Sequence, residues 1–290
     1  MTIGVTGASG FIGRNLYDSL NKHYSIVQID LKDRLLDNYD FSGIDVIVHL
    51  AGIAHKIKSS DIDIYFKVNR DLAYQTALKA KKEGVRHFIF MSTSKVYGDF
   101  SPVDKAFDET SKCNPLDAYA KSKYEAEMLI TDLSDEFFKV AVLRPPLVYG
   151  PGVKANMLNL IKLVDKIPII PLKGVGNKRS LVYVENLIFV LGTIIERKLS
   201  GVFIPADKQP LSTSEIVQFI IAAVPQKRKL VSIPSFLNRI FRTLFPYYYS
   251  RILGSFILDN SITQKFLQEQ IPYSSEYGVK ATVDWYLKYK

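Results

Sequence analysis

The sequence predicts an α/β protein with a doubly wound parallel sheet and a smaller C-terminal α/β lobe. Short apolar runs alternate with helical patterns through the first 150 residues, and a glycine-rich turn follows the first run. From about residue 150 the alternation becomes less regular and proline and glycine become frequent, as in RPPLVYGPG and IPIIPLKGVG. Strand, helix and strand in repetition build a parallel sheet that is covered by helices on both faces.

The first half contains five runs with the length of buried parallel strands. They lie at 3–6, 25–30, 45–50, 87–92 and 139–144. Helical patterns lie between them near 11–22, 62–83 and 117–135. We therefore assign residues 1–150 to the domain that contains the sheet.

The second half, residues 151–290, is predicted to form mainly the smaller, substrate-binding lobe. Its helical patterns lie near 155–165, 185–197 and 213–224. Strands are expected to return to the main sheet near 180–204.

Composition limits the class of protein. The chain has 290 residues, of which 47% are apolar and 23% are charged, and these values are close to the globular average. No apolar run approaches the ~20 residues of a membrane span, and MTIGVTGASG leads directly into a strand without a targeting pattern. A single cysteine, Cys113, excludes an internal disulfide, and the four histidines lack metal-ligand spacing, so we expect a cytoplasmic protein without a bound metal.

The net charge of +9 is concentrated in one region. No acidic residue lies between Glu215 and Asp259, while six basic residues fall there, at 227–229, 239, 242 and 251. The region has no nucleic-acid-binding motif, so no nucleic-acid partner is expected. Contact with an anionic membrane surface through FLNRIFRTLFPYYYSR is a second interpretation. We favour a packed segment whose basic groups face solvent or an anionic substrate.

The first strand ends in VTGASGFIG, with Gly7, Gly10 and Gly13 spaced three residues apart before a helix. Such glycines form a tight turn and let the backbone approach a pyrophosphate at the helix N-terminus. Asp30 follows at the end of the second strand, where a carboxylate accepts hydrogen bonds from a ribose diol and repels a 2′-phosphate. The pattern predicts NAD in preference to NADP, although the nearby Lys32 and Arg34 weaken the discrimination.

Two further groups lie where this fold places chemistry. Ser92, Thr93 and Ser94 reach the carboxyl edge of the sheet, where hydroxyls can bind a substrate oxygen or simply form a turn. Tyr119 and Lys123 are four residues apart on a predicted helix, so both lie on one face. A nearby ammonium lowers the pKa of a phenol from about 10 toward neutrality and makes it an acid/base. The alternative is an exposed helical pair with no chemical role.

These motifs together resemble the extended short-chain dehydrogenase/reductase family, a Rossmann-fold family, and in particular its nucleotide-sugar epimerases and dehydratases. The resemblance covers nearly the whole chain through TGASGFIG, HLAG, STSKVYG, YAKSK, RPPLVYGPG and RSLVYVEN. It implies that Tyr119 is the catalytic acid/base, that Lys123 lowers its pKa and holds the nicotinamide ribose, and that Thr93 assists. It implies cofactor contacts at the glycine turn and at Phe11, Ile12, Asp30, Leu50, Ala51, Gly52, Asn69, Tyr119, Lys123 and Pro146. It implies contacts to the sugar nucleotide at Ser92, Thr93, Ser94, Asn156, Arg179 and Arg251.

One departure narrows the expected reaction. Dehydratases of this family carry an Asp-Glu pair directly after the threonine, and here Ser94 and Lys95 stand in those places. Without a carboxylic acid to protonate a leaving hydroxyl, dehydration is disfavoured.

Two reactions at carbon 4 of a UDP-sugar remain, in a bacterial polysaccharide pathway. One is reduction of a 4-keto sugar, slightly favoured at this point, and the other is 4-epimerisation of UDP-glucose or UDP-N-acetylglucosamine. A non-catalytic cofactor sensor is a remote alternative, because the tyrosine and the lysine are both retained. The resemblance also implies a homodimer formed through the helices near 62–83 and 117–135.

Overall fold

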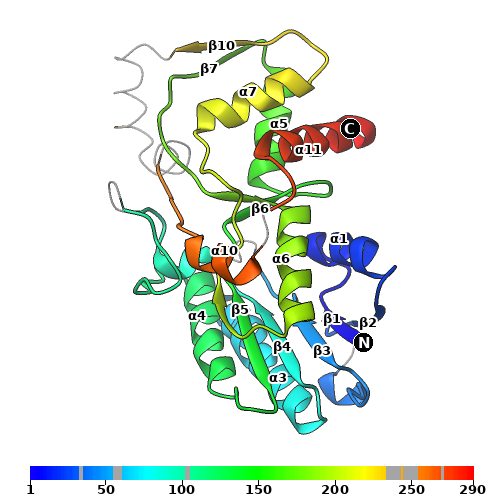
Figure 1. Ribbon diagram of the computed structural model, residues 1–290. Helices are drawn as coiled ribbons and strands as arrows, with labels where there is room; N and C mark the ends of the chain where they lie inside the picture. The colour runs from blue at the N-terminus through cyan, green and yellow to red at the C-terminus, as the bar shows by residue number, and fades with distance from the viewer. Residues whose placement is uncertain (33–34, 55–60, 102–104, 233–242, 244–253, 269–270) are drawn as a thin grey trace.

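The fold was described from a computed structural model, which covers residues 1–290 except 33–34, 55–60, 102–104, 233–242, 244–253 and 269–270. Its main sheet has six parallel strands in the order β2-β1-β3-β4-β5-β9 (Figure 1). These are β1 (Thr2–Thr6), β2 (Ser25–Ile29), β3 (Val46–His49), β4 (His87–Met91), β5 (Lys139–Leu143) and β9 (Gly201–Phe203). The order reverses between β1 and β3, where ligands bind in doubly wound sheets, so the predicted fold class is confirmed.

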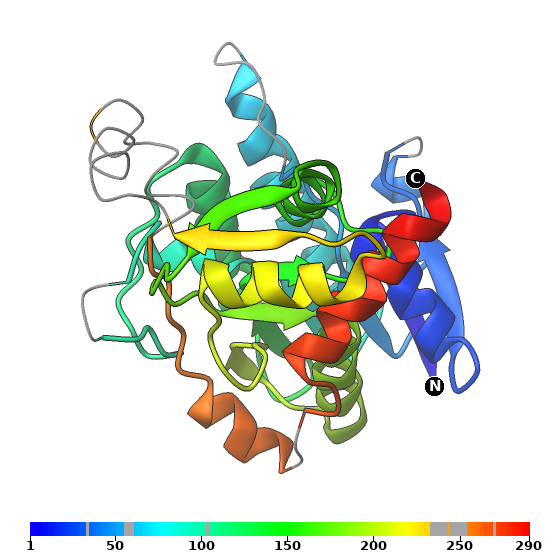
Figure 2. The ribbon, with the colours of Figure 1, turned by 90° about the horizontal axis from the view of Figure 1, so that it is seen from above.

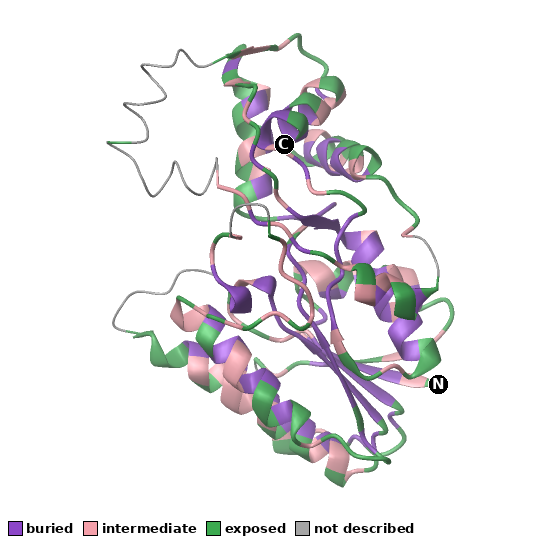
Figure 3. Ribbon diagram, turned by 60° about the vertical axis from the view of Figure 1, so that its left-hand side comes forward, coloured by how far each residue is buried: buried purple, intermediate pink, exposed green. Residues whose placement is uncertain are grey.

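Helices cover both faces of this sheet because its central strands, such as β3 and β4, are buried and apolar on both sides. In β4, Ile89 and Met91 pack in the cluster that includes α1 (Phe11–Leu20) and α6 (Val184–Arg197). Phe88 and Phe90 point the other way, into the cluster of α3 (Leu72–Lys82) and α4 (Ala118–Thr131). Figure 3 shows the buried strands between helices whose outer surfaces are exposed. Because successive side chains of a strand point to opposite faces, a strand made of an uninterrupted apolar run is buried on both faces.

The helix predicted over 62–83 consists of three consecutive segments. A short turn, α2 (Asp63–Tyr65), leads into a π-helix, η3 (Phe66–Asp71), and then into α3. A π-helix widens the backbone locally and is frequent at functional sites. Here it contains Asn69, which is completely buried.

The second lobe stands above the sheet (Figures 1 and 2). The described part of this lobe contains two parallel strand pairs and three longer helices. The pairs are β6 (Leu147–Tyr149) with β8 (Leu181–Tyr183), and β7 (Ile169–Lys173) with β10 (Lys229–Ser232). The helices are α5 (Asn156–Lys166), α7 (Thr213–Ala223) and α11 (Ser275–Tyr289). The shorter α10 (Ser261–Leu267) lies lower, beside α6, where the Thr263 hydroxyl accepts a hydrogen bond from the N–H of Ile204 after β9 (Figure 1). Within the region 180–204, β9 pairs with β5 in the main sheet, while β8 lies outside it. A domain boundary at residue 150 stays a prediction.

A buried carboxylate joins the elements of this lobe. Asp207 accepts hydrogen bonds from the hydroxyl of Tyr149 at 2.7 Å, the backbone N–H of Tyr183 at 3.0 Å, the Asn186 amide at 2.8 Å and the Ser275 hydroxyl at 3.1 Å. Burial nevertheless raises the pKa of Asp207, and these hydrogen bonds oppose the rise. Strands β6 and β8 and helices α6 and α11 are thereby held around one acceptor.

The basic region beyond Glu215 is only partly described. Its segment 236–251, for which membrane contact was considered, lies outside the described residues apart from Thr243. Within the described part, the Arg228 guanidinium donates a 2.9 Å hydrogen bond to the carbonyl of Val164 and another to that of Asp165, near the C-terminus of α5. This is the favoured end of a helix for a cation. No described helix has the length and apolar character needed to cross a membrane.

Candidate active site

The glycine turn brings backbone, not side chains, to the end of β1. Gly7 has φ +68°, and a Cβ there would lie 2.8 Å from the backbone nitrogen of Ala51. At Gly13 a Cβ would lie 2.5 Å from the carbonyl oxygen of Gly7, so a side chain is excluded at both positions. Gly10 is the N-cap of α1, and no side chain caps this helix end. The N-terminal backbone N–H groups of α1, which no side chain caps, therefore fit the pyrophosphate that the sequence predicts.

Asp30 lies directly after β2 and is exposed to solvent. Its carboxylate accepts a 3.0 Å hydrogen bond from the backbone N–H of Lys32, and its own backbone is held by the Tyr39 hydroxyl. The carboxylate is thus fixed at the carboxyl edge of the sheet and keeps acceptor capacity for a ribose diol. Arg34 lies outside the described residues.

The loop after β3, which contains Leu50, Ala51 and Gly52, is held by Asn69. The Asn69 carboxamide accepts from the N–H of Ile53 at 2.8 Å and donates to its carbonyl at 3.0 Å. It also donates to the Ser122 hydroxyl at 3.1 Å, which links the loop to α4. The contacts of Asn69 are therefore with the cofactor loop, and a direct contact with a dinucleotide stays a prediction.

Tyr119 and Thr93 come together from different elements. Tyr119 is the second residue of α4, whose N-cap is Asp117, and Thr93 is the residue after which the short 3₁₀ helix η4 (Ser94–Tyr97) begins. A hydrogen bond from the Thr93 side chain lowers the pKa of Tyr119, but burial outweighs it and raises this pKa to about 12, with smaller raising effects from Asp117 and Tyr65. A joint role of Tyr119 and Thr93 in catalysis stays a prediction.

Lys123 faces the end of β4. Its side chain is buried, and its ammonium donates a 2.9 Å hydrogen bond to the carbonyl oxygen of Met91 and lies 4.7 Å from the ring centre of Phe90. Burial lowers the pKa of Lys123 to about 8, and the charge of Glu127 opposes this shift. The sequence predicted that Lys123 would lower the pKa of Tyr119. The structure instead shows a raised pKa, because removal of the phenol from water is the largest effect.

A buried ion pair beneath the site was missed from the sequence. Glu127 and Arg144 pair at 2.6 Å with almost no exposure, and Arg144 also donates to the Tyr97 hydroxyl at 2.9 Å. Ser92 donates its hydroxyl to the same Glu127 carboxylate. The spacing of Lys123 and Glu127 on one helix face was an available signal. Ser92 thus contacts Glu127 in this structure, and its contact with substrate stays a prediction.

The residues expected to bind the sugar nucleotide lie in different places. Ser94 is buried at the start of η4, Asn156 is exposed at the start of α5, and Pro146 is buried between β5 and β6. The Arg179 guanidinium donates to the carbonyl of Gly254 at 3.1 Å. Arg179 precedes β8, whereas Asn156 follows β6, and Arg251 lies outside the described residues. Binding by these residues stays a prediction.

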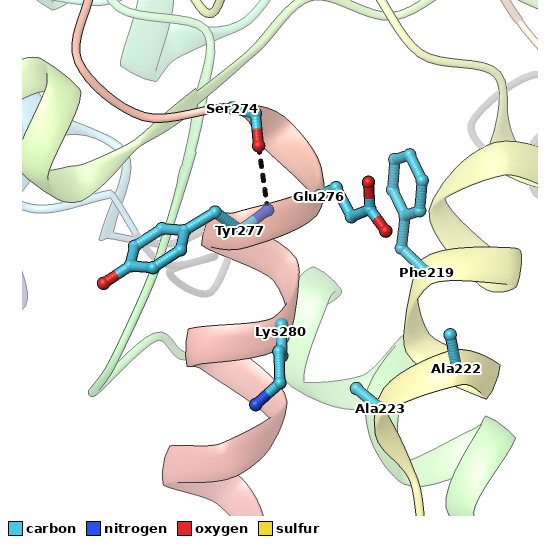
Figure 4. Close-up of a pocket in the computed structure, with 7 residues that line it drawn as sticks. All are labelled: Phe219, Ala222, Ala223, Ser274, Glu276, Tyr277 and Lys280. Carbon is cyan, nitrogen blue, oxygen red and sulfur yellow. Dashed lines mark hydrogen bonds between the residues drawn. The ribbon is translucent and has the colours of Figure 1, made fainter.

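A separate hollow lies between α7 and α11 (Figure 4). It has a volume of about 360 Å³, and Ser274, one of its lining residues, accepts a 3.2 Å hydrogen bond from the N–H of Tyr277. None of the described site residues lines it, so it is distinct from the predicted active site.

Comparison with known proteins agrees with this geometry. A dinucleotide cradle with a tyrosine and a lysine at the strand ends is the arrangement of an NAD-dependent oxidoreductase fold. Residues 3–203 match the NAD dependent epimerase/dehydratase family, and this chain belongs to that family. It is thus an NAD-dependent enzyme of the nucleotide-sugar epimerase and reductase group.

Individual relatives are similar over most or all of their length. UDP-glucose 4-epimerase of Vibrio cholerae is 32% identical, with 99% of this chain and 96% of that protein aligned. N-acetyl-alpha-D-glucosaminyl-diphospho-ditrans,octacis-undecaprenol 4-epimerase of Escherichia coli O157:H7 is 26% identical over 79% of this chain and 74% of its own. The crystal structure of UDP-glucuronic acid 4-epimerase from Bacillus cereus in complex with NAD has a TM-score of 0.77 and 26% identity, with 100% of both chains covered.

Proposed function

We propose that this enzyme epimerises carbon 4 of a UDP-hexose and uses NAD as a cofactor that is regenerated in each cycle. The observation that carries the proposal is the contact of α4 with the sheet: the Lys123 ammonium donates a 2.9 Å hydrogen bond to the carbonyl of Met91, the last residue of β4, one turn beyond Tyr119. Thr93 follows the same strand end, so a sugar hydroxyl at this edge can meet both the Tyr119 and the Thr93 side chains.

The protein's own groups would handle the proton and the orientation of the sugar. Tyr119 takes the proton of the carbon 4 hydroxyl and later returns it, and the Thr93 hydroxyl hydrogen-bonds the same oxygen and holds it in line. A bound nicotinamide would supply the hydride chemistry at carbon 4. Lys123 would hold the nicotinamide ribose. Its ammonium lies close to Gly52, since a Cβ added at Gly52 would be 3.1 Å from the ammonium nitrogen.

The relatives lead us to reverse the order of the two reactions that the sequence left open. The proteins compared above are named 4-epimerases, so epimerisation now stands ahead of 4-keto sugar reduction. Dehydration remains disfavoured, because Lys95 stands at the position of a catalytic acid and its ammonium pairs with Asp117.

The test is incubation with UDP-glucose, UDP-N-acetylglucosamine and UDP-glucuronic acid, each with and without added NADH or NADPH, followed by separation of the sugar nucleotides. Interconversion at carbon 4 without added reduced cofactor is the expected result. Turnover of UDP-4-keto sugars that requires added reduced cofactor would establish the reductase instead. Stoichiometric NAD binding without turnover of any of these sugars would favour the sensor.

We also propose that the enzyme is a homodimer formed through α3 and α4, as the resemblance implied. Leu78 on α3 and Met128 and Leu129 on α4 are each at least 39% exposed. A second copy that buries these side chains removes apolar surface from water. Light scattering should give about 66 kDa, twice the 32.9 kDa of the chain, and Leu129→Lys should shift this toward the monomer mass.

The predicted cytoplasmic location is checked by cell fractionation.

A further inference from the structure

Lys95 stands at a position where dehydratases of this family carry an acidic residue, and it forms ion pairs of its own. Lys95 lies in η4, two residues after Thr93, and its ammonium pairs with the carboxylate of Asp117 and, at 3.3 Å, with that of Asp99. Asp117 is the N-cap of α4, and its other oxygen accepts the backbone N–H of Ala120 at 2.8 Å. Lys95 is therefore joined to the first turn of the helix that carries Tyr119.

These contacts link Thr93 to the helix that carries Tyr119. The Thr93 side chain accepts from the backbone N–H of Lys95 at 3.3 Å, and Lys95 in turn contacts the N-cap of α4 through its side chain. We propose that Lys95 is a positioning residue, which ties η4 to the N-cap of α4 and so holds Thr93 and Tyr119 at their reactive separation. This inference rests on the proposed function of that pair and adds to it the residue that sets its geometry.

An exposed lysine–aspartate pair is by itself worth little, since the Lys95 side chain is 32% exposed and solvent screens the attraction. Lys95 can still affect the geometry of the site, because its partner Asp117 is already fixed at the N-terminus of α4 as the N-cap. The ion pair therefore connects η4 to a side chain that does not move freely. Small displacements of reacting groups have large kinetic effects even where the effect on stability is small.

Lys95 also places a positive charge beside a carboxylate that affects the phenol. Burial is the largest cause of the raised pKa of Tyr119, Asp117 and Tyr65 raise this pKa further, and Thr93 lowers it. Loss of the Lys95 ammonium would remove a positive charge from beside the Asp117 carboxylate and raise this pKa, because a negative charge disfavours the phenolate.

The experiment compares Lys95→Met, Lys95→Arg and Lys121→Met in the full-length enzyme, with Lys121 as an exposed lysine on α4, the helix that carries Tyr119. We expect Lys95→Met to lower kcat about 10-fold with KM changed less than about two-fold, and to move the acid limb of the kcat–pH profile to higher pH. Lys95→Arg should restore most of kcat, and Lys121→Met should match the parent enzyme.

A double-mutant cycle assigns the effect to Asp117. Asp117→Asn keeps an N-cap side chain but loses the charge. Lys95→Met added to Asp117→Asn should therefore lower kcat no further. Full additivity of the two substitutions, or equal kcat and pH profiles for Lys95→Met and Lys121→Met, would overturn the proposal.

A second readout is independent of turnover. Amide hydrogen exchange in the first turn of α4, at Ala120, should become about 2- to 5-fold faster in Lys95→Met, because the cap that accepts this N–H is no longer held. Absence of turnover in the parent enzyme would remove the proposed function but leave this measurement in place. Unchanged exchange would show that Lys95 does not position α4.

Discussion

The Lys123 ammonium donates a 2.9 Å hydrogen bond to the carbonyl oxygen of Met91, the last residue of β4. Helix α4 is thereby bound to the carboxyl edge of the sheet one turn beyond Tyr119. The same contact keeps a cation within the protein interior, where burial lowers its pKa to about 8. The pair that we propose to be catalytic thus combines a lysine whose charge is disfavoured by burial with a tyrosine whose pKa burial raises to about 12.

Tyr119→Phe should abolish proton transfer while leaving the fold intact. Turnover is expected to fall about 100-fold or more, since a general acid/base contributes 10²–10⁴-fold, while NAD affinity changes little. Because the phenol must lose its proton and its pKa is raised, kcat/KM of the parent enzyme should increase from pH 7 to pH 9, and the variant should lose this increase. Parent-like turnover in Tyr119→Phe would exclude Tyr119 as the acid/base.

Lys123→Met should increase stability while it removes activity. The lysine has a pKa of 10.5 in its unperturbed state and about 8 here, so its charge opposes folding at neutral pH. We expect the free energy of unfolding at pH 7 to rise by about 1–3 kcal/mol in the variant.

The pH dependence of this gain has a definite sign. Between pH 8 and 10.5 the unfolded chain binds more protons at Lys123 than the folded one, so the parent protein gains stability and the advantage of the variant shrinks. Urea unfolding at several pH values measures this, with the exposed Lys121→Met as control. A variant less stable than the parent at pH 7 would contradict it.

Gly13→Ala should disrupt the dinucleotide cradle. Its Cβ would lie 2.5 Å from the carbonyl oxygen of Gly7 and 2.7 Å from the Cα of Ala8, and both are backbone atoms that cannot move independently. We expect a loss of at least about 2 kcal/mol in the free energy of unfolding together with loss of NAD binding. Gly192→Ala, in the interior of α6 with no atom within 4 Å of its Cβ, should instead add up to about 1 kcal/mol. Equal effects of the two alanines on NAD affinity would refute the assignment of the cradle.

Arg179→Ala should weaken binding of the sugar nucleotide more than binding of NAD. A guanidinium that pairs with a phosphate contributes a charge-assisted hydrogen bond, so KM for the sugar nucleotide is expected to rise about 10-fold or more. Calorimetric NAD affinity should stay within about two-fold. Arg86→Ala, an exposed arginine next to the N-terminal end of β4, serves as the control and should change neither value. A larger change in NAD affinity than in KM would place Arg179 in the cofactor site.

Much of the fold could be predicted from the chain. The apolar runs at 25–30 and 139–144 became β2 and β5, and the helical pattern over 117–135 became α4, because periodicity and propensity act over neighbouring residues. The glycine turn could be predicted for the same reason, since only residues without a Cβ fit its backbone. The return of β9 to the sheet was expected only as a region, because a three-residue strand is specified mainly by its neighbour β5.

The sequence by itself determined the order of strands and helices and the residue types available at the carboxyl edge of the sheet. Only the tertiary structure decided how these groups are paired: Lys123 with Met91, Ser92 with Glu127 and Lys95 with Asp117. It also decided the direction in which the pKa of Tyr119 shifts. The physical reason is that helix and strand patterns depend on local spacing, whereas ion pairs and desolvation depend on contacts between segments far apart in the chain.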